Sequence, residues 1–403
     1  MPSSDFPMSL SLEEAQQRVV SICKSRQLAI DTIPLQVAVG RVLAEDAHAS
    51  DDIPAFDNSA MDGFAVRGED LPCEGEARFQ VMETLLAGHV TQRVLGVGQC
   101  MRIMTGARMP NGADTVVIKE RVRVEANIAV IGAGERQGSN VRPRGEEMLA
   151  GQLAVGRGQR IRATHASLLA SLGMDRVRVF RQPRASIIST GDELVMPGQS
   201  CSGAQIYNSN GFGLAALLGG AGAQLDRADE SPDGLPFRHV ADDREQLRCA
   251  LLDAARASEV VITSGGVSAG EADHLPGLVR ELGQVHFWKV RLRPGMPFLF
   301  GEIEGALLFC LPGNPVSSLV TFQSLVRPAL RALQGDRELH PRWLHARLVA
   351  PVRKQHQRTE MLRGSLESGE DGTLNVRVSS RQGSAMISGM LEIGRASCRE
   401  RVY

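Results

Sequence analysis

Residues 260–274 read VVITSGGVSAGEADH, an apolar run that ends in hydroxyls, two adjacent glycines and acids. Residues 260–263 have the length and apolar character of a buried strand, and Gly265 and Gly266 follow almost directly. Adjacent glycines let a backbone come close to a ligand, and free N–H groups at such a turn attract anions. Two glycines after a strand are also a common structural turn, and a pattern of this kind does not establish a site by itself. The stretch alone therefore leaves two interpretations open, a phosphate-holding turn followed by Ser268 and metal-binding acids, or a plain turn.

The surrounding residues, 185–333, alternate apolar runs with amphipathic segments. Strands are expected at 185–190, 260–263, 284–290 and 307–311, and helices at 211–220, 242–257, 276–282 and 319–333, with Asn210 as an N-cap. This alternation predicts a mostly parallel sheet with helices on both faces. Ligands of such sheets bind beyond the carboxyl ends of the strands. Three strand ends carry polar or glycine-rich loops, at 191–193, 264–266 and 312–315, which favours a pocket over a plain turn.

The remaining segments predict smaller, β-rich parts. A capping box at 11–14 opens a helix over 11–24, a helix is expected at 163–172, and a strand at 177–180. Residues 76–150 contain short alternating runs separated by turn residues, as do 345–349, 360–364 and 374–378. The predicted fold class is therefore a multidomain α/β plus β protein: a central α/β domain with a mostly parallel sheet, a β-rich insert domain and a small C-terminal β domain.

Composition excludes several classes of protein. The chain of 403 residues has 43% hydrophobic and 23% charged residues, which are globular values, and its net charge of −1 and 4% aromatic content argue against a nucleic-acid or membrane-surface partner. The seven cysteines include no C-x-x-C pair, so a zinc or redox motif is not expected. No apolar run of about 18 residues and no signal-peptide pattern is present. We expect a cytoplasmic protein.

Two further polar segments leave alternatives open. Residues 51–66 concentrate acids, an asparagine and a serine between apolar residues, which favours a metal or substrate-contact loop, although Asp62-Gly63 alone is also an ordinary hairpin turn. Residues 140–147 alternate arginine and glutamate. They suit either a solvated cluster of ion pairs or a site for a bound oxyanion.

Taken together, these motifs closely resemble the molybdopterin molybdenumtransferases, the MoeA-type enzymes related to the E domain of gephyrin. The resemblance covers roughly residues 9–392 and follows the order of the family's motifs. Those motifs are DNSAMDG (57–63), MTGA (104–107), GEE (145–147), STGDEL (189–194), NSN (208–210), TSGGVS (263–268) with Glu271 and Asp273, RPG (293–295) and LPGNPVS (311–317).

The resemblance implies the last step of molybdenum cofactor synthesis, in which adenylylated molybdopterin and molybdate give the metal-loaded cofactor and AMP. It implies Mg²⁺ at the scissile anhydride and a homodimer whose cleft lies between subunits, with molybdopterin adenylyltransferase and other cofactor-synthesis proteins as further partners. It also implies four domains. We place them at 7–47 with 151–180 (a discontinuous N-terminal linker domain), 48–150 (the β-rich insert domain), 181–333 (the molybdopterin-binding α/β domain) and 334–403 (the C-terminal β domain).

Roles carry over from the resemblance position by position. The catalytic set is Asp62, Thr105, Glu193, Asp243 (or its neighbour Asp242) and Asp273. The metal ligands are Glu193, Asp273 and Glu147. The cofactor-binding set is Ser264, Gly265, Gly266, Ser268, Arg293, Pro312, Asn314, Pro315, Arg363 and Ser384. Asp62 and Thr105 are expected to reach the turn at 264–266 from another domain, by way of the other subunit.

Three departures from the family pattern bear on these roles. Glu147 stands where relatives often have aspartate, and Met296 stands where many have lysine, leaving Arg291 and Arg293 to supply the positive charge. Residues 394–403, GRASCRERVY, lack the apolar pattern of a closing strand, so we interpret them as a non-native tail and expect the last domain to lack an edge strand even if the tail is genuine. Intact mass compared with the gene sequence tests this interpretation.

Two alternatives accompany the enzyme. A gephyrin-like scaffold or binding protein is disfavoured by acids at three separate loops, 62, 193 and 273, which a pure scaffold does not need. Tungstate insertion cannot be separated from molybdate insertion by sequence, because the two anions are nearly the same size.

Overall fold

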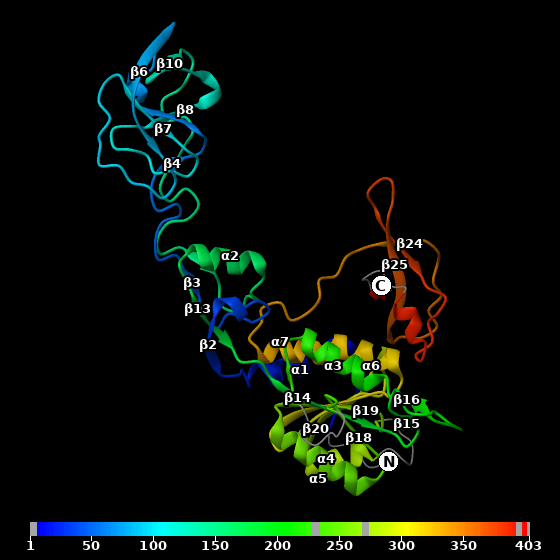
Figure 1. The fold of residues 1–403 in the computed structure, drawn as a ribbon. Helices are drawn as coiled ribbons and strands as arrows, with labels where there is room; N and C mark the ends of the chain where they lie inside the picture. Colours follow the sequence, from blue (N-terminus) through cyan, green and yellow to red (C-terminus); the bar gives the residue numbers. More distant parts are fainter. Residues whose placement is uncertain (1–5, 227–233, 268–273, 392–396, 401–403) are drawn as a thin grey trace. The chain divides into compact units, whose positions relative to one another are not determined.

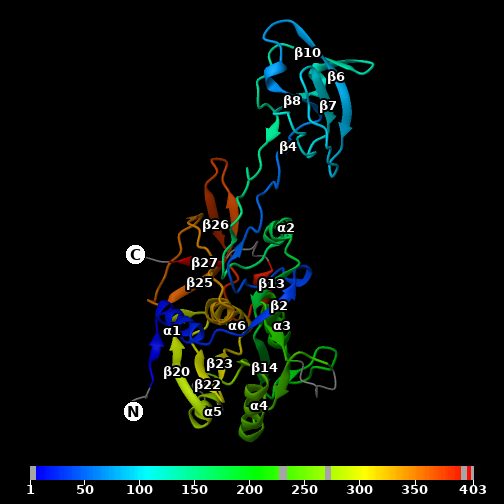
Figure 2. The same cartoon turned by 90° about the vertical axis from the view of Figure 1, so that its left-hand side faces the viewer.

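The chain divides into two compact units, each described here by itself (Figures 1 and 2). The computed structural model describes residues 6–226, 234–267, 274–391 and 397–400. Unit 1 comprises Met1–Glu45, Gly158–Arg162 and Arg176–Tyr403, and unit 2 comprises Asp46–Arg157 and Ala163–Asp175. The division into four domains stays a prediction.

Unit 1 is built on an eight-stranded sheet in the order β1-β20-β22-β23-β19-β14-β17, with β18 also paired to β14. Its strands are β1 (Met8–Leu10), β14 (Arg184–Thr190), β17 (Gln224–Leu225), β18 (Arg238–Val240), β19 (Val260–Ser264), β20 (Gly283–Val290), β22 (Leu299–Ile303) and β23 (Ala306–Leu311). The β20–β22 and β22–β23 pairs are antiparallel, and the other five pairs are parallel. The mostly parallel sheet is therefore confirmed, with one antiparallel meander added to it.

Helices cover both faces of this sheet (Figure 1). One face packs against α1 (Leu12–Lys24), α3 (Asn210–Gly220) and the segment formed by α6 (Pro315–Thr321), a π-helical turn (Phe322–Val326) and α7 (Arg327–Leu333); the other packs against α4 (Arg244–Ala257) and α5 (Leu275–Leu282). In β19, Val260 and Ile262 join the first core and Val261 joins the second. Because both faces are buried, the strand is an uninterrupted apolar run, as the sequence indicated.

One helix prediction is confirmed and two differ in detail from the structure. The capping box predicted for α1 is present, with the Ser11 hydroxyl accepting from the Glu14 N–H and the Glu14 carboxylate accepting from the Ser11 N–H. The single helix expected at 319–333 instead begins at Pro315 and is interrupted by the π-helical turn. Asn210 is the first residue of α3 and not its N-cap, a position that Ser209 occupies.

The rest of unit 1 contains short strands. β2 (Ile30–Pro34) pairs with β13 (Arg176–Phe180), and β15 (Leu194–Val195) pairs with β16 (Ile206–Tyr207). A five-stranded sheet contains β21 (Leu292–Arg293), β24 (Arg347–Leu348), β25 (Thr359–Ser368), β26 (Leu374–Val378) and β27 (Ser397–Glu400). The expectation of a missing edge strand is wrong, because the backbone of β27 pairs antiparallel with β25. Backbone pairing does not require an apolar side-chain pattern, so the pattern could not reveal it.

Unit 2 is β-rich, as predicted. Its main sheet has the order β8-β5-β7-β6-β10-β9 and consists of β5 (Gly63–Val66), β6 (Glu76–Leu85), β7 (Gln99–Ile103), β8 (Thr115–Ile118), β9 (Val122–Glu125) and β10 (Ile128–Gly132). Two small pairs, β3 (Ala47–His48) with β12 (Leu153–Val155) and β4 (Asn58–Ser59) with β11 (Val141–Arg142), and the helix α2 (Ala163–Ser171) complete it. No helix in the described part of the chain is long and apolar enough to cross a membrane.

Candidate functional site

The turn after β19 requires glycine. Gly265 has φ +103° and Gly266 has φ +63°, conformations that L side chains rarely adopt. A Cβ on Gly265 would lie 2.7 Å from both the carbonyl oxygen and the hydroxyl of Thr190. Thr190 ends β14, the parallel neighbour of β19, so the register of the two strands brings their carboxyl ends together. The approach of Gly265 to the Thr190 backbone, and the positive φ of both residues, explain the glycine pair without invoking a ligand.

A second observation points to a ligand at this edge. The Thr190 hydroxyl is buried beside the glycine turn and has no hydrogen-bond partner among the described residues. The side-chain amide nitrogen of Asn208 and the hydroxyl of Ser318 are buried and unpartnered in the same way. Buried polar groups in folded proteins are nearly always hydrogen-bonded, so orphaned ones call for an explanation. A polar ligand at the strand ends would supply the partner that Thr190 lacks.

Asn210 ties three loops of this edge together. Its Nδ2 donates to the Ser264 hydroxyl at 2.8 Å and to the Gly313 carbonyl at 2.7 Å. Sequence reasoning gave this residue a capping role and missed its tertiary one. The NSN motif was the available signal, but nothing in the motif indicates which way the amide points. The predicted binding residue Ser264 is thus held by a side chain from another element.

The loop after β23 joins this edge to a neighbouring cavity. Pro312 is buried, Asn314 takes the N-cap position of α6, and Pro315 opens the helix. The next residue, Val316, donates its N–H to the Ser384 carbonyl at 3.0 Å. The loop therefore places the predicted residues 312–315 beside Ser384, which comes from the C-terminal part of the chain.

The predicted acids are not gathered into one cluster among the described residues. The Glu193 carboxylate is exposed and folds over Gly191, whose carbonyl is 2.9 Å from Nε2 of His239. Asp243 caps α4, accepting the Gln246 N–H at 2.8 Å, a structural role that accounts for its position without catalysis. Ser268, Glu271 and Asp273 lie outside the described residues.

Glu147 belongs to unit 2. Its side chain is exposed, and its N–H donates to the Ile53 carbonyl at 2.9 Å. Within the described ranges, no group of three or more His, Cys, Asp or Glu side chains could hold a metal ion. The described residues do not by themselves form a magnesium site.

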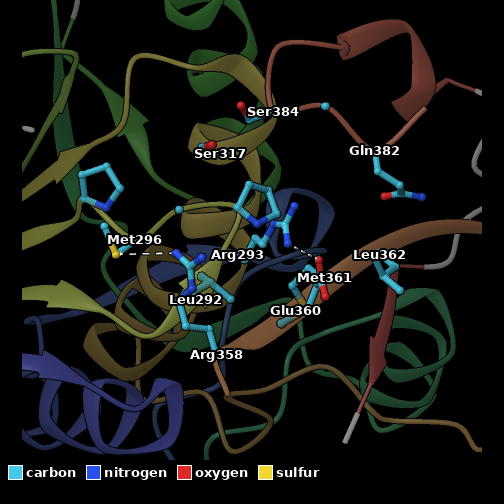
Figure 3. Close-up of a pocket in the computed structure, with 14 residues that line it drawn as sticks. Leu292, Arg293, Met296, Ser317, Arg358, Glu360, Met361, Leu362, Gln382 and Ser384 are labelled. Atoms are coloured by element: carbon cyan, nitrogen blue, oxygen red, sulfur yellow. Dashed lines mark hydrogen bonds and ion pairs between the residues drawn. The ribbon is translucent and has the colours of Figure 1, made fainter. Parts of the chain in front are cut away.

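A cavity of about 340 Å³ lies where β21 pairs with β25 (Figure 3). Two predicted binding residues, Arg293 and Ser384, line it. Arg293 is 3.5 Å from the carboxylate of Glu360, a pair that offsets part of its charge. The other lining residues are Leu292, Pro294, Gly295, Met296, Pro297, Ser317, Arg358, Met361, Leu362, Gln382 and Gly383.

Two further arginines, Arg363 and Arg291, have contacts that the sequence did not indicate. The Arg363 guanidinium is buried and donates to the carbonyls of Met386 at 2.8 Å and Gly383 at 3.0 Å, so it holds the loop that carries Ser384. Burial lowers the pKa of this guanidinium. Arg291 does not line the cavity; its guanidinium lies 4.0 Å from the carboxylate of Glu14. Of the two arginines expected to supply the charge missing at Met296, Arg293 lines this cavity and Arg291 does not, and their role toward an anion stays a prediction.

In unit 2 the structure brings Asp62 and Thr105 together. Asp62 Oδ1 accepts from the N–H and from the hydroxyl of Thr105, both at 2.9 Å, and Asp62 Oδ2 is 3.5 Å from Nζ of Lys119. The two bonds from Thr105, assisted by the charge of Lys119, hold the pKa of Asp62 below its usual value. The carboxylate is therefore kept ionised and oriented, which a plain hairpin turn does not require.

Comparison with known proteins agrees with the geometry. Residues 10–173 match the family model "MoeA N-terminal region (domain I and II)", and residues 186–332 match "Probable molybdopterin binding domain". The molybdopterin molybdenumtransferase of Haemophilus influenzae is 34% identical over 95% of this chain and 92% of its own length. That of Staphylococcus aureus (strain MSSA476) is 31% identical over 96% of this chain and 90% of its own.

The fold is shared with a solved structure. The molybdopterin biosynthesis MoeA protein of Pyrococcus horikoshii OT3 superposes with a TM-score of 0.79 at 25% identity, covering 97% of each chain. The conserved length, the two matched regions and the common fold give one conclusion: this chain belongs to the molybdopterin molybdenumtransferase family.

Proposed function

We propose that this chain acts in molybdenum cofactor biosynthesis by inserting molybdate into adenylylated molybdopterin, with release of AMP. The observation that carries the proposal is the glycine turn of Gly265 and Gly266 beside the unpartnered hydroxyl of Thr190. The turn lies at the carboxyl ends of parallel strands, where α/β sheets bind ligands. It suits a phosphate of the pterin substrate, which would accept hydrogen bonds from the backbone and from Thr190.

Each site has a separate task in this proposal. The turn and Asn210, Ser264 and Gly313 around it would orient the pterin phosphate, while the cavity beside Ser384 would hold molybdate. Asp62, fixed as an anion by Thr105, would act from unit 2 and, as the family resemblance implies, from the partner subunit of a homodimer. We place the protein in the cytoplasm, where a molybdopterin adenylyltransferase would supply its substrate.

Mg²⁺ is the proposed metal, and it would stabilise charge at the anhydride that is cleaved. Glu193, at a strand end of unit 1, is the described candidate ligand there, and Asp273 and Glu147 remain predicted ligands. Since the described residues do not assemble a ligand set, we derive no step through the metal. Removing divalent ions with a chelator and restoring Mg²⁺ tests this requirement.

The deciding experiment is AMP release from adenylylated molybdopterin by the purified chain, with and without molybdate and magnesium. Asp62→Ala and Glu193→Gln are expected to abolish cofactor formation while circular dichroism and the thermal midpoint persist. Unchanged AMP release by both variants would remove the catalytic assignment. Replacing molybdate with tungstate measures the preference between the two anions, and a protein partner captured without any molybdate-dependent AMP release would favour a scaffold.

A further inference from the structure

We propose that Lys119 binds a phosphate of the substrate beside Asp62 and holds the second oxygen of that carboxylate in place. Lys119 is then both a substrate-binding residue and a positioning residue for Asp62. The inference rests on the proposed function for the substrate, an adenylylated pterin with a phosphate anhydride. Its geometric basis lies entirely within unit 2, and no motif of the sequence pointed to this lysine.

The pairing of β5 with β7 and β8 places Lys119 opposite Asp62. Gly63 pairs antiparallel with Ile103 of β7 and with Ile118 of β8. The residue before Gly63 therefore lies across from the residue after Ile118, which sets Asp62 opposite Lys119. A backbone hydrogen bond fixes this pair, because the Lys119 N–H donates to the Asp62 carbonyl at 3.1 Å.

Gly63 makes this close pairing possible. The backbone of β5 approaches β8 so closely here that a Cβ on Gly63 would overlap the Val117 carbonyl oxygen. Glycine inside a strand is typical of a place where another backbone comes very near. The glycine that follows Asp62 thus lets β8 bring Lys119 up to the carboxylate.

The two oxygens of Asp62 have different partners. Oδ1 accepts both hydrogen bonds from Thr105, whereas Oδ2 lies 3.5 Å from Nζ of Lys119. An ammonium group has three N–H donors. The Lys119 side chain is 54% exposed, and its other carboxylate neighbour, Glu120, is 4.0 Å away. Two carboxylates leave at least one donor of Lys119 available to an anion from solution.

A phosphate that approaches Asp62 requires a cation at this place. The bonds from Thr105 keep Asp62 ionised, and a carboxylate and a phosphate close together repel each other. Lysine is a common phosphate ligand and acts as a compact point charge. Because Lys119 already lies against Oδ2, its ammonium can offset the charge of the carboxylate and of the phosphate at once.

The test measures binding of adenylylated molybdopterin to the full chain in the absence of molybdate, so that turnover does not consume the substrate. Lys119→Met keeps the length of the side chain and removes its charge, and we expect binding to weaken by about 3- to 10-fold, a modest loss because the lysine is half-exposed. Lys119→Arg restores a cation and should stay within about twofold of the parent.

The matched control is Arg121→Met. Arg121 ends the same 3-10 turn, Lys119–Arg121, and its guanidinium is paired at 2.8 Å with the carboxylate of Glu135. The substitution removes one positive charge from the same turn without touching Asp62, so binding should stay within about twofold of the parent.

The pH profile of AMP release gives a second readout. The charge of Lys119 contributes to the low pKa of Asp62, so the acidic limb should move to higher pH in Lys119→Met and stay in place in Lys119→Arg. Parent-like binding by Lys119→Met would overturn the inference, as would an equal loss in Arg121→Met. An unaltered protein that binds the pterin and releases no AMP with molybdate would instead refute the proposed function, while the binding comparison would still report on Lys119.

Discussion

Gly265→Ala is the sharpest probe of the turn at the strand ends. The new Cβ would lie 2.7 Å from the Thr190 carbonyl oxygen, which is fixed in β14 and cannot rotate away. The left-handed backbone at φ +103° costs a non-glycine residue roughly 1–3 kcal/mol. Overpacking costs roughly 1–3 kcal/mol more. We therefore expect the free energy of unfolding of unit 1 to fall by about 2–6 kcal/mol.

The matched control is Gly277→Ala. Gly277 lies on the exposed side of α5, where an added Cβ meets no atom within 4 Å, so alanine should stabilise the helix by about 0.5–1 kcal/mol. Thermal and urea unfolding of both variants, followed with a probe specific to unit 1, compare the two effects. AMP release at saturating substrate then separates loss of fold from loss of binding. If Gly265→Ala is no less stable than Gly277→Ala, the steric account of the turn is refuted.

Three further substitutions test other parts of the molecule. Asn210→Ala removes two hydrogen bonds, including that to Ser264. We expect it to lower the free energy of unfolding by about 1–3 kcal/mol and to raise the KM for the pterin. An unchanged KM would contradict the role of Asn210 at the strand ends. Thr105→Val removes the hydroxyl donor that helps to lower the pKa of Asp62. The pKa of Asp62 should therefore rise, and the acidic limb of the pH profile of AMP release should move to higher pH. An unmoved limb would show that Asp62 does not determine it. Burial lowers the pKa of His286 below 6.5, so below that pH the unfolded chain binds a proton that the folded chain does not. The free energy of unfolding should therefore rise as the pH is raised toward 6.5. In His286→Gln, the difference between the urea midpoints at about pH 5 and about pH 7.5 should be smaller than in the parent.

Much of the α/β part of the fold follows from local patterns. The strands β14, β19 and β23 were each expected within one residue of their observed bounds, because runs buried on both faces leave an unambiguous apolar signal. The expected helix at 319–333 was less accurate, because the helix begins four residues earlier, at Pro315, and a π-helical turn with i→i+5 hydrogen bonds interrupts it. Likewise, β27 carries no apolar signal and pairs through its backbone.

The sequence predicted site residues only where one short motif both requires a special backbone conformation and lies at the expected binding edge of the sheet. Gly265 and Gly266 show in the sequence because a left-handed turn and a close approach both demand glycine. Arg363 was expected to contact substrate, which stays a prediction, and its guanidinium also donates to two carbonyls of the loop that carries Ser384. The sequence shows that position 363 is an arginine, but it does not show which groups accept hydrogen bonds from the guanidinium. Those partners depend on which loop packs against the side chain in the folded protein.

Part of the cavity's positive charge, that of Arg358, depends on strand pairing and not on distance along the chain. The sequence offered Arg291 and Arg293, five and three residues before Met296, as the remaining cations, and only Arg293 of the two lines the cavity. Strand β21 instead pairs in parallel with β25, in a register that sets Leu292 beside Thr359. The residue that precedes Thr359 is Arg358, which the register carries to the cavity wall from more than sixty positions away. A register shift of one residue would turn alternate side chains to the opposite face of the strand, so the place of Arg358 at this wall is a consequence of the pairing of β21 with β25.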